Sequence, residues 1–344
     1  MLSTETLPAV VRPSGDNPNS INSVAPTEQI HGRPPSFCTG CPERPIFTAL
    51  KLAEKETGKH HISADIGCHL FSILPPFNIG ATTMGYGLGA AGAAALHDTK
   101  SDKRTISFMG DGGFWHNGLT SGIGNAVFNK SDGLVVVVDN AYSAATGGQD
   151  LLSSSASSEI RSTKHPIERA VRGVGVEWAK TVTNTFKVGE MKKLFKEALS
   201  TKELGPKVIV AQSECTLNKT RRERPQMAKQ IKEGKRVVRE RFGIDPDTCT
   251  GDHSCIRING CPSLTIAENP DPMRKDPIAA ILNTCVGCGL CGEAAHAAVL
   301  CPSFYKTSVI SNPSIWDKSK AKIRDFIIGT LQRGIERRLS GIEA

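Results

Sequence analysis

The residues most informative for chemistry are Gly-Asp-Gly-Gly at positions 110–113, directly after the apolar run 105–109. The run is typical of a buried strand, and glycines after a strand let backbone N–H groups approach a diphosphate. Asp111 adds a hard oxygen ligand of the kind that Mg²⁺ prefers. Because a tight turn between a strand and a helix uses the same residues, this motif alone is a weak signal.

A second strand end strengthens the interpretation. The apolar run 134–138 leads into Asp-Asn-Ala-Tyr at 139–142. Carboxyl ends of parallel strands meet at one edge of an open α/β sheet, where such sheets bind ligands. The pair resembles the thiamine-diphosphate signature, GDG followed by a strand that ends in Asn; the alternative is a tight turn beside an Asx turn. On that resemblance, Mg²⁺ is held by Asp111, the Asn140 side chain and the Tyr142 backbone carbonyl.

The same resemblance predicts the residues around the cofactor. The loop Thr-Gly-Gly-Gln at 146–149 resembles the one that follows in the 2-oxoacid:ferredoxin oxidoreductases. His69 and His116 flank the motifs; each could bind a substrate carboxylate, relay a proton or serve only the structure. The predicted cofactor-binding residues are Gly110, Asp111, Gly112, Gly113, Asn140, Tyr142, Thr146 and Gly147.

Eleven cysteines are spaced in a way that favours metal binding over disulfides. A Cys-x-x-Cys pair alone could be a redox dithiol or half of a zinc site. Two other cysteines each follow a strand-like run, which places thiolates at the edge that carries the diphosphate motif. Four thiolates there favour an iron–sulfur cluster, because zinc is redox-silent. We call these four the N-terminal thiol set: Cys38, Cys41, Cys68 and Cys215.

The other seven cysteines lie between residues 245 and 312 and include two Cys-Pro ends. Two-cluster ferredoxins use repeated C-x2-C-x2-C-x3-C-P runs, and the last cysteine of each run binds the other cluster. Exchange of this kind predicts one 4Fe–4S cluster, held by the Cys261 set: Cys261, Cys285, Cys288 and Cys291. It predicts a second cluster, Asp-ligated 4Fe–4S or 3Fe–4S, held by the Cys249 set: Cys249, Asp252, Cys255 and Cys301. A zinc module is the alternative.

In combination, residues 34–340 resemble the alpha subunit of indolepyruvate:ferredoxin oxidoreductase. The resemblance implies that the N-terminal thiol set ligates a 4Fe–4S cluster beside thiamine diphosphate. It also shows a departure, because the family's N-terminal pyrimidine-binding domain, whose Glu activates the thiamine ring, has no counterpart here. We therefore expect another chain to complete the active site. The motifs that carry the resemblance are Cys38-x2-Cys41-Pro-Glu-Arg-Pro, Asp65-Ile-Gly-Cys68, the GDG and DN pair, Cys215 and the ferredoxin-like tail.

The resemblance implies an activity and its partners. The activity is oxidative decarboxylation of an aryl 2-oxoacid such as indolepyruvate to CO₂ and acyl-CoA, with electrons passed through up to three clusters to ferredoxin. The partners are CoA, ferredoxin, a beta subunit and the chain with the pyrimidine-binding domain. A non-oxidative thiamine enzyme would not need the cysteines. An electron-transfer subunit with a non-catalytic thiamine-type fold is the other alternative.

The 344 residues predict about two domains. Alternating helix and strand signals indicate an α/β fold: a mainly parallel sheet that binds thiamine diphosphate, followed by a small ferredoxin-like iron–sulfur domain. The predicted helices are 45–55, 87–96 and 188–199; the predicted strands are 60–66, 105–109, 134–138 and 207–212. The predicted segments are a leader 1–35, the cofactor domain 36–218, a basic linker 219–244, the two-cluster domain 245–312 and a C-terminal docking helix 313–344.

Composition and charge limit the possible location and partners of the protein. Without a long apolar run or an apolar signal core, we expect a cytoplasmic protein with no membrane span. The net charge is +8, and ten Lys or Arg lie between residues 219 and 241, but only 5% of residues are aromatic, so nucleic acid is not favoured. A solvated helix face is the first interpretation of this stretch; an acidic electron carrier or a CoA phosphate is the other. The apolar spacing in 316–339 predicts docking, or contact with a membrane surface.

Overall fold

The computed structural model describes residues 35–96, 103–154 and 164–340, with side chains up to residue 334. The predicted leader 1–35 lies outside these residues apart from Pro35. So do the side chains of Ile335 and Leu339, which the helical pattern near the C-terminus included.

A six-stranded sheet in the order β2-β1-β3-β4-β6-β5 forms the first part of the fold. All neighbouring strands are parallel, which confirms the predicted α/β class and its mainly parallel sheet. The strands are β1 (Ile62–Ala64), β2 (Thr82–Thr83), β3 (Ile106–Gly110), β4 (Leu134–Asp139), β5 (Trp178–Val182) and β6 (Lys207–Gln212).

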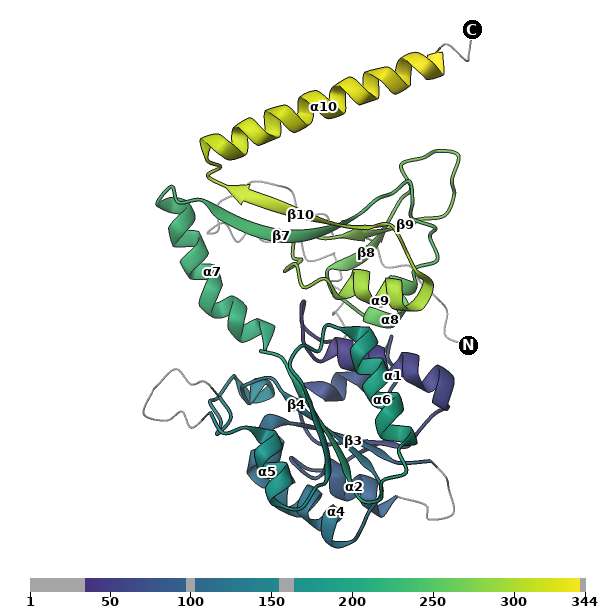
Figure 1. Cartoon of the computed structure of the whole chain (residues 1–344), viewed down its shortest axis with the longest axis vertical. Helices are drawn as coiled ribbons and strands as arrows, with labels where there is room; N and C mark the ends of the chain where they lie inside the picture. The colour runs from purple at the N-terminus through teal and green to yellow at the C-terminus, as the bar shows by residue number, and fades with distance from the viewer. Residues whose placement is uncertain (1–34, 97–102, 155–163, 341–344) are drawn as a thin grey trace, which may run out of the picture. The chain divides into compact units, whose positions relative to one another are not determined.

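Helices cover both faces of this sheet, α1 and α6 on one and α2, α4 and α5 on the other (Figure 1). The first face carries α1 (Arg44–Thr57), the 3-10 helix η1 (Cys68–Ile73) and α6 (Val188–Ser200). The second carries α2 (Gly89–Ala95), α3 (Asp111–Gly113), the π-helix η2 (Phe114–Gly124), α4 (Asn125–Phe128) and α5 (Ile167–Gly173). A short 3-10 helix, η3 (Ala144–Thr146), follows β4.

Strand β4 shows why the sheet is buried on both faces. Leu134, Val136 and Val138 pack in the apolar cluster under α1 and α6. The alternate residues Val135 and Val137 pack in the cluster under η2 and α5. Side chains alternate across a strand, so a continuous run of branched apolar residues fits a strand with helices on each side.

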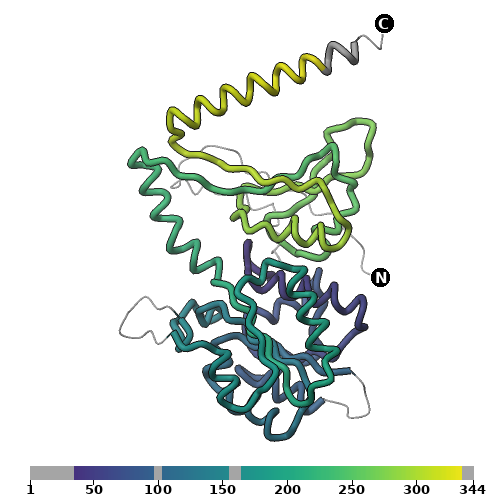
Figure 2. The backbone as a smooth tube through the Cα atoms, viewed as in Figure 1, coloured from purple at the N-terminus to yellow at the C-terminus, as the bar shows by residue number. Residues whose placement is uncertain are grey.

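The second part of the fold repeats a strand–helix–strand unit, β7-α8-β8 and then β9-α9-β10. In Figure 2 the strand at 237–244 runs beside the one at 304–311, and this pair and β8–β9 are both antiparallel. The small core of this part consists of Cys249, Cys255, Leu264, Ile278, Ala279 and Ala295. The elements are β7 (Val237–Ile244), α8 (Ser254–Asn259), β8 (Leu264–Ala267), β9 (Ile278–Ile281), α9 (Leu290–Val299) and β10 (Phe304–Ser311).

The basic segment 219–244, predicted as a linker, has regular structure. It contains most of helix α7 (Thr216–Lys232) and all of β7. Lys, Arg, Glu, Gln and Met are good helix formers, which favours α7 although Pro225 lies inside it. Since β7 pairs with β10, residues 237–244 share a sheet with the segment that the sequence assigned to the two-cluster domain.

Helix α10 (Ile315–Ser340) follows and matches the helix predicted near the C-terminus. Asp317, in the first turn of α10, accepts a hydrogen bond from Arg236 Nε at 2.6 Å. Further along, the described apolar side chains are exposed, including Ile323, Phe326 and Leu331. Among the described residues, none of the helices combines the length and apolar character that crossing a bilayer requires.

Candidate functional site

The carboxyl ends of the parallel strands bring the predicted motifs to one edge of the sheet. Asp111 follows β3, Asn140 follows β4, and Cys215 lies just beyond β6. The backbone joins two of these loops directly, because the Cys215 N–H donates to the Asn140 carbonyl at 3.0 Å. The segment after β1 contributes Cys68, the first residue of η1.

Asp111 is buried with its carboxylate held by backbone donors. Gly112 N–H donates to Oδ1 at 2.8 Å, and Asn140 N–H donates to Oδ2 at 3.1 Å. Burial and the neighbouring charge of Asp139 raise the pKa of Asp111 well above its usual range. A bound cation would reverse this effect by favouring the ionised carboxylate.

A second buried carboxyl, Glu43, faces the same loops. The Asn140 side-chain nitrogen donates to Glu43 Oε1 at 3.3 Å, and Asn140 Oδ1 accepts from the Tyr142 N–H at 3.3 Å. Glu43 Oε2 is buried without a hydrogen-bond partner, and burial raises the pKa of this carboxyl. Glu43 was not among the predicted site residues; in the sequence it is marked only by its place in the motif Cys38-x2-Cys41-Pro-Glu-Arg-Pro.

The two glycines after Asp111 lie where there is no room for a side chain. A Cβ added to Gly113 would lie 2.0 Å from Asp65 Oδ2, and one added to Gly112 would lie 2.0 Å from the Tyr86 hydroxyl. Asp65 Oδ2 also accepts the Gly87 N–H at 2.7 Å. The loop therefore lies directly against two side chains, Asp65 and Tyr86, whose roles were not predicted from the sequence.

The predicted loop 146–149 lies beside Tyr86. Ser143 Oγ is 2.9 Å from the Tyr86 hydroxyl and 2.8 Å from Thr146 Oγ1. Gly147 has a φ of 121°, a backbone conformation that favours glycine. Thr146 and Gly147 are exposed, so a ligand can reach them.

The two histidines differ in their surroundings. His69 is buried, and its Nε2 lies 2.6 Å from Asp65 Oδ1 and 3.0 Å from the Asp65 carbonyl. Burial lowers the pKa of His69, but the hydrogen bond and charge of Asp65 outweigh it, so the pKa is raised. His116 is exposed, and its ring centroid lies 5.4 Å from that of Tyr86.

All eleven cysteines lie in the described residues as free thiols. In the N-terminal thiol set, burial, the Glu43 carboxylate and neighbouring thiols of the set raise the pKa of Cys68 to about 12. Burial also raises the pKa of Cys41, and the charge of Cys68 adds to this effect. Burial likewise raises the pKa of Cys215, and the charge of Cys38 adds to it. Each of the four thiols therefore influences, or is influenced by, the charge of another member of the set.

The C-terminal cysteines divide in the same way. Burial and the other three thiols of the Cys261 set raise the pKa of Cys291. In the Cys249 set, burial and the charges of the other members raise the pKa of Cys255 to about 11. Asp252 uses both carboxylate oxygens locally, accepting the Ser254 N–H at 3.2 Å and the Ser254 hydroxyl at 2.8 Å.

The sets are loose groups rather than points of convergence. In the part of the chain that the structure describes, no group of three or more His, Cys, Asp or Glu side chains is arranged to hold a single metal ion. The loop 283–288 of the Cys261 set is tied to β7, because Arg241 Nη1 donates to the carbonyls of Asn283 and Cys285, each at 2.6 Å.

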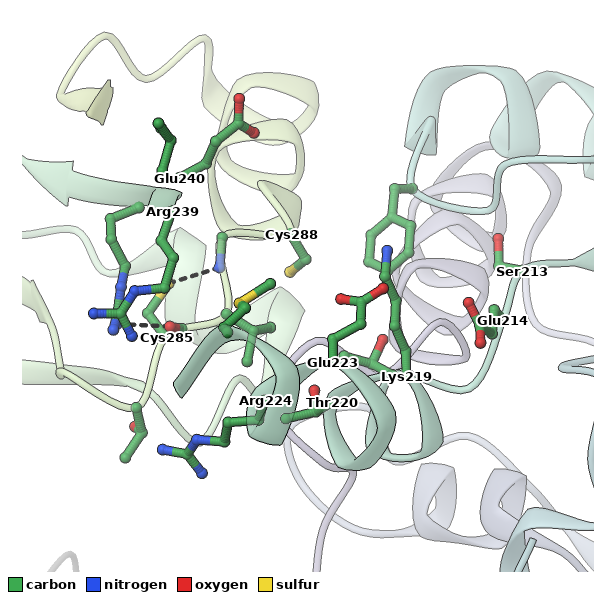
Figure 3. Close-up of a pocket in the computed structure, with 18 of the residues that line it drawn as sticks. Ser213, Glu214, Lys219, Thr220, Glu223, Arg224, Arg239, Glu240, Cys285 and Cys288 are labelled. Atoms are coloured by element: carbon green, nitrogen blue, oxygen red, sulfur yellow. Dashed lines mark hydrogen bonds between the residues drawn. The ribbon is translucent and has the colours of Figure 1, made fainter. Parts of the chain in front are cut away.

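A cavity of about 660 Å³ borders the Cys261 set. As Figure 3 shows, Lys219, Glu223 and Arg224 of α7 face Arg239 and the loop with Cys285 and Cys288 across this space. Positive and negative side chains both line it. The cavity therefore gives a charged ligand or protein surface access to two thiols of the Cys261 set.

Comparison with known proteins agrees with the motifs. The sequence model of the family described as "Thiamine pyrophosphate enzyme, C-terminal TPP binding domain" matches residues 65–211. This range includes Asp65, Asp111 and Asn140, and it ends shortly before Cys215.

Curated relatives carry the name "Indolepyruvate oxidoreductase subunit IorA". The protein from Pyrococcus abyssi is 30% identical over 280 residues, which are 77% of this chain and 40% of that protein. The one from Pyrococcus horikoshii is 29% identical over 279 residues, with the same coverage of both chains. These matches confirm the resemblance found in the sequence. The chain spans about two fifths of the length of the curated relatives it matches.

A solved structure gives a weaker likeness. It is the 2-oxoglutarate:ferredoxin oxidoreductase from Magnetococcus marinus with 2-oxoglutarate, coenzyme A and succinyl-CoA bound, and it is 20% identical. The alignment covers 54% of this chain and 65% of that one, with a TM-score of 0.46. At this level the likeness carries no conclusion about the present chain.

Proposed function

Since the chain is similar to the indolepyruvate oxidoreductase IorA subunits, we propose that it is the thiamine-diphosphate-binding, electron-accepting part of a 2-oxoacid:ferredoxin oxidoreductase. Its substrate is an aryl 2-oxoacid of the indolepyruvate type, and the products are CO₂, an acyl-CoA and reduced ferredoxin. One observation carries the proposal: Asp111, Asn140 and Cys215 lie at the same edge of one parallel sheet.

The residues at this edge fit thiamine diphosphate with Mg²⁺. Gly112 and Gly113 offer backbone N–H groups at a helix start, where a diphosphate is stabilised. Asp111, Asn140 and the Tyr142 carbonyl offer the oxygens that Mg²⁺ prefers. Buried carboxyls with raised pKa values, Asp111 above all, favour a bound cation. Thiamine diphosphate supplies, when bound, the electron sink that lets a 2-oxoacid lose CO₂.

The donor chemistry of the thiol sets fits iron–sulfur clusters. Each set groups thiols that are free and half-buried or buried, apart from the exposed Cys38. A cluster several atoms wide needs ligands around it rather than ligands that converge on one ion. We propose 4Fe–4S clusters at the N-terminal thiol set and the Cys261 set, which supply one-electron acceptors when bound.

The Cys249 set is proposed to hold the third cluster. It has three thiols, and Asp252 stands where a fourth cysteine is expected. Because Asp252 is engaged with Ser254, it either leaves that partner to bind the fourth iron or leaves a 3Fe–4S cluster. An EPR spectrum with only all-thiolate 4Fe–4S signals from this part of the chain would exclude both forms. The repeated strand–helix–strand units support a ferredoxin-like domain around the two C-terminal sets.

Partners follow from the same proposal. The curated relatives are named as a subunit, and we propose that a beta subunit and a chain with the pyrimidine-binding domain complete the enzyme. Ferredoxin is proposed to approach the Cys261 set at the cavity beside it, where Lys219, Arg224 and Arg239 offer charge for an acidic carrier. CoA enters the completed enzyme. The free thiols and the clusters they would hold suit a cytoplasmic location.

The alternative is an electron-transfer subunit whose thiamine-type fold binds no cofactor. Thiamine diphosphate binding separates the two. We expect the full chain to bind thiamine diphosphate only with Mg²⁺, and Asp111→Asn to weaken binding at least 100-fold, or about 2.7 kcal/mol, because the negative charge of a metal ligand is lost. Isothermal titration calorimetry of the anaerobically purified chain measures this.

The control is Asp325→Asn, which removes a carboxylate from an exposed position in α10. It should leave cofactor affinity unchanged, and Asp111→Asn should leave the iron content unchanged. If the unmodified chain, purified with its partners, binds no thiamine diphosphate at any Mg²⁺ concentration, the electron-transfer alternative holds and the enzyme proposal fails.

A further inference from the structure

Arg44, the first residue of α1, is a buried charge that lacks a charged partner. Its side chain is 0% exposed. Nη1 donates to Asn259 Oδ1 at 2.6 Å, while Nε and Nη2 have no hydrogen-bond partner. No ion pair of Arg44 occurs among the described residues. Because a guanidinium cannot give up its proton, this is a costly arrangement unless an anion is added.

Asn259 extends the same cluster of unpartnered donors. It is the last residue of α8, two positions before Cys261, and it is 0% exposed. Its Oδ1 accepts from Arg44, and its Nδ2 is buried without a partner. This cluster therefore contains three buried donor nitrogens without an acceptor: Arg44 Nε, Arg44 Nη2 and Asn259 Nδ2. A buried donor without an acceptor costs about 1–3 kcal/mol, and more when it is charged.

The position of Arg44 is between two thiol sets. Cys41 precedes it by three residues, and Cys41 and Cys288 both pack in the apolar cluster that α1 shares with Leu290 of α9. Asn259, to which Arg44 donates, lines one small cavity with Cys261, Cys288 and Cys291. One cation thus lies beside the Cys261 set and within three residues of Cys41 in the N-terminal thiol set.

We infer that Arg44 is the shared cationic partner of two iron–sulfur clusters, those of the N-terminal thiol set and the Cys261 set. This inference rests on the proposed function, which supplies the clusters. An all-thiolate cluster is an anion, and reduction adds one more negative charge. A buried cation beside it stabilises the reduced form and raises the reduction potential, and its hydrogen bonds to sulfur act in the same direction. Arg44 is thus a positioning residue, since it acts through the clusters.

The test is an EPR redox titration of the full chain, purified anaerobically with its partners. In Arg44→Met, both clusters should need a more negative potential for half-reduction. At a fixed potential the ratio of reduced to oxidised cluster should fall at least tenfold, equivalent to 59 mV for one electron. The cluster of the Cys249 set should keep its potential. The apo form of Arg44→Met should be no less stable, because an apolar side chain replaces an unpaired buried charge.

Two further variants keep the inference falsifiable if Arg44→Met fails to assemble its clusters. Arg44→Lys keeps the charge and should keep both potentials near those of the unmodified chain. Arg44→Gln keeps N–H donors without charge and should shift both in the negative direction. Arg236→Met is the matched control, because it removes a guanidinium that pairs with Asp317 in α10; it should move neither potential.

The outcomes separate the two claims. If iron and sulfide analysis finds no clusters in the unmodified chain, the proposed function fails. If the clusters are present and the charge-removing variants shift only one potential or neither, the inference alone is overturned. Equal shifts in Arg44→Lys and Arg44→Gln would also overturn it, because charge would then not be the cause.

Discussion

Buried carboxyls define the proposed cofactor site at the scale of single residues. Asp111, Asp139 and Glu43 are all buried, and burial raises the pKa of each. Asp139 is stabilised by Gln212 Nε2 at 2.9 Å, but Glu43 Oε2 has no partner. Such a group of acids is unfavourable in an empty protein. It becomes favourable once a divalent cation binds, which is why we assign these residues to binding rather than to stability.

Alanine at either of the two glycines after Asp111 should reduce stability by a different amount but affect cofactor binding in the same way. In Gly113→Ala the new methyl group meets Asp65 Oδ2, and this carboxylate is fixed by the Gly87 N–H at Oδ2 and by His69 at Oδ1. We expect a loss of about 2 kcal/mol in unfolding free energy. In Gly112→Ala it meets the end of the Tyr86 side chain, which can swing away, so the loss should be under about 1 kcal/mol. Urea denaturation measures both.

Both alanine variants should lose Mg²⁺-dependent thiamine diphosphate binding, since each added methyl group collides with Asp65 or Tyr86 and displaces the loop that we propose as the diphosphate site. The matched control is Gly189→Ala in α6, where an added Cβ meets nothing within 4 Å. It should gain about 0.5–1 kcal/mol and bind the cofactor normally. Normal cofactor binding by Gly112→Ala would contradict the assignment of this loop.

Single residues were predictable from the sequence where a local motif marks them. Asp111 and Asn140 follow apolar strands and carry their own signal. Glu43 and Tyr86 do not, because their roles arise from contacts across the fold: Glu43 reaches Asn140, and Tyr86 reaches Ser143. Ferredoxin-type spacing predicts the two C-terminal cysteine sets and strand ends predict the N-terminal thiol set, but no sequence pattern indicates that Arg44 is buried.

Helix α1 connects the parts of the site at the scale of elements. It begins directly after the Cys38–Cys41 pair, and its buried face packs on the sheet and against α6. It also contacts α8, since the Thr48 hydroxyl donates to the Ile258 carbonyl at 2.8 Å. Movement of α1 would therefore displace both the N-terminal thiol set and Arg44.

A charge pair between α1 and α6 predicts a pH effect. Glu56 accepts hydrogen bonds from Lys192 and Lys196, which lower its pKa from 4.5 to about 2. A depressed carboxyl pKa adds stability above pH 4.5 that is lost as the pH falls towards 2. Glu56→Gln should therefore make acid destabilisation shallower between pH 4.5 and 2, by a small amount because the group is exposed and screened.

Unfolding midpoints at pH 7, 4 and 3 in low salt measure this effect. Glu177→Gln, which changes an exposed glutamate before β5, is the control and should keep the slope of the unmodified chain. If Glu56→Gln leaves the pH dependence of the unfolding midpoint unchanged, or if its effect grows with added salt, the proposed stabilisation by Glu56 with Lys192 and Lys196 is wrong.

Elements were predictable where burial is continuous. Strands β3, β4 and β6 and helices α1 and α6 lie where apolar pattern placed them, because both faces of the sheet are covered. Strand β5 was missed because it lies at the sheet edge and its residues Lys180 and Thr181 are exposed. Strand β2 is two residues long, too short for a pattern. The β7–β10 pair is largely exposed, so tertiary pairing rather than burial defines it.

Helix α10 matters at the scale of the whole molecule. Ile323 is 61% exposed, Phe326 70% and Leu331 63%. Apolar side chains at helical spacing that stay exposed are typical of a surface covered by a partner. We propose that this surface docks a partner chain of the enzyme.

Replacing Ile323, Ile327 and Leu331 with Gln should change the unfolding free energy by no more than about 0.5 kcal/mol, because exposed side chains contribute little to stability. The same variant should lose its partner chains during anaerobic affinity purification. The control Lys318→Gln with Lys322→Gln changes charged positions of the same helix and should retain them. Retention of all partners by the apolar variant would show that α10 is not the docking surface.

We propose that one molecule joins a thiamine site to iron–sulfur clusters. The most direct measurement follows the visible iron–sulfur absorbance of the anaerobic chain with its partners, Mg²⁺ and thiamine diphosphate while indolepyruvate is added. We predict bleaching that requires both oxoacid and thiamine diphosphate and that is lost in Asp111→Asn. Bleaching by dithionite but never by a 2-oxoacid would contradict the account and leave an electron-transfer subunit.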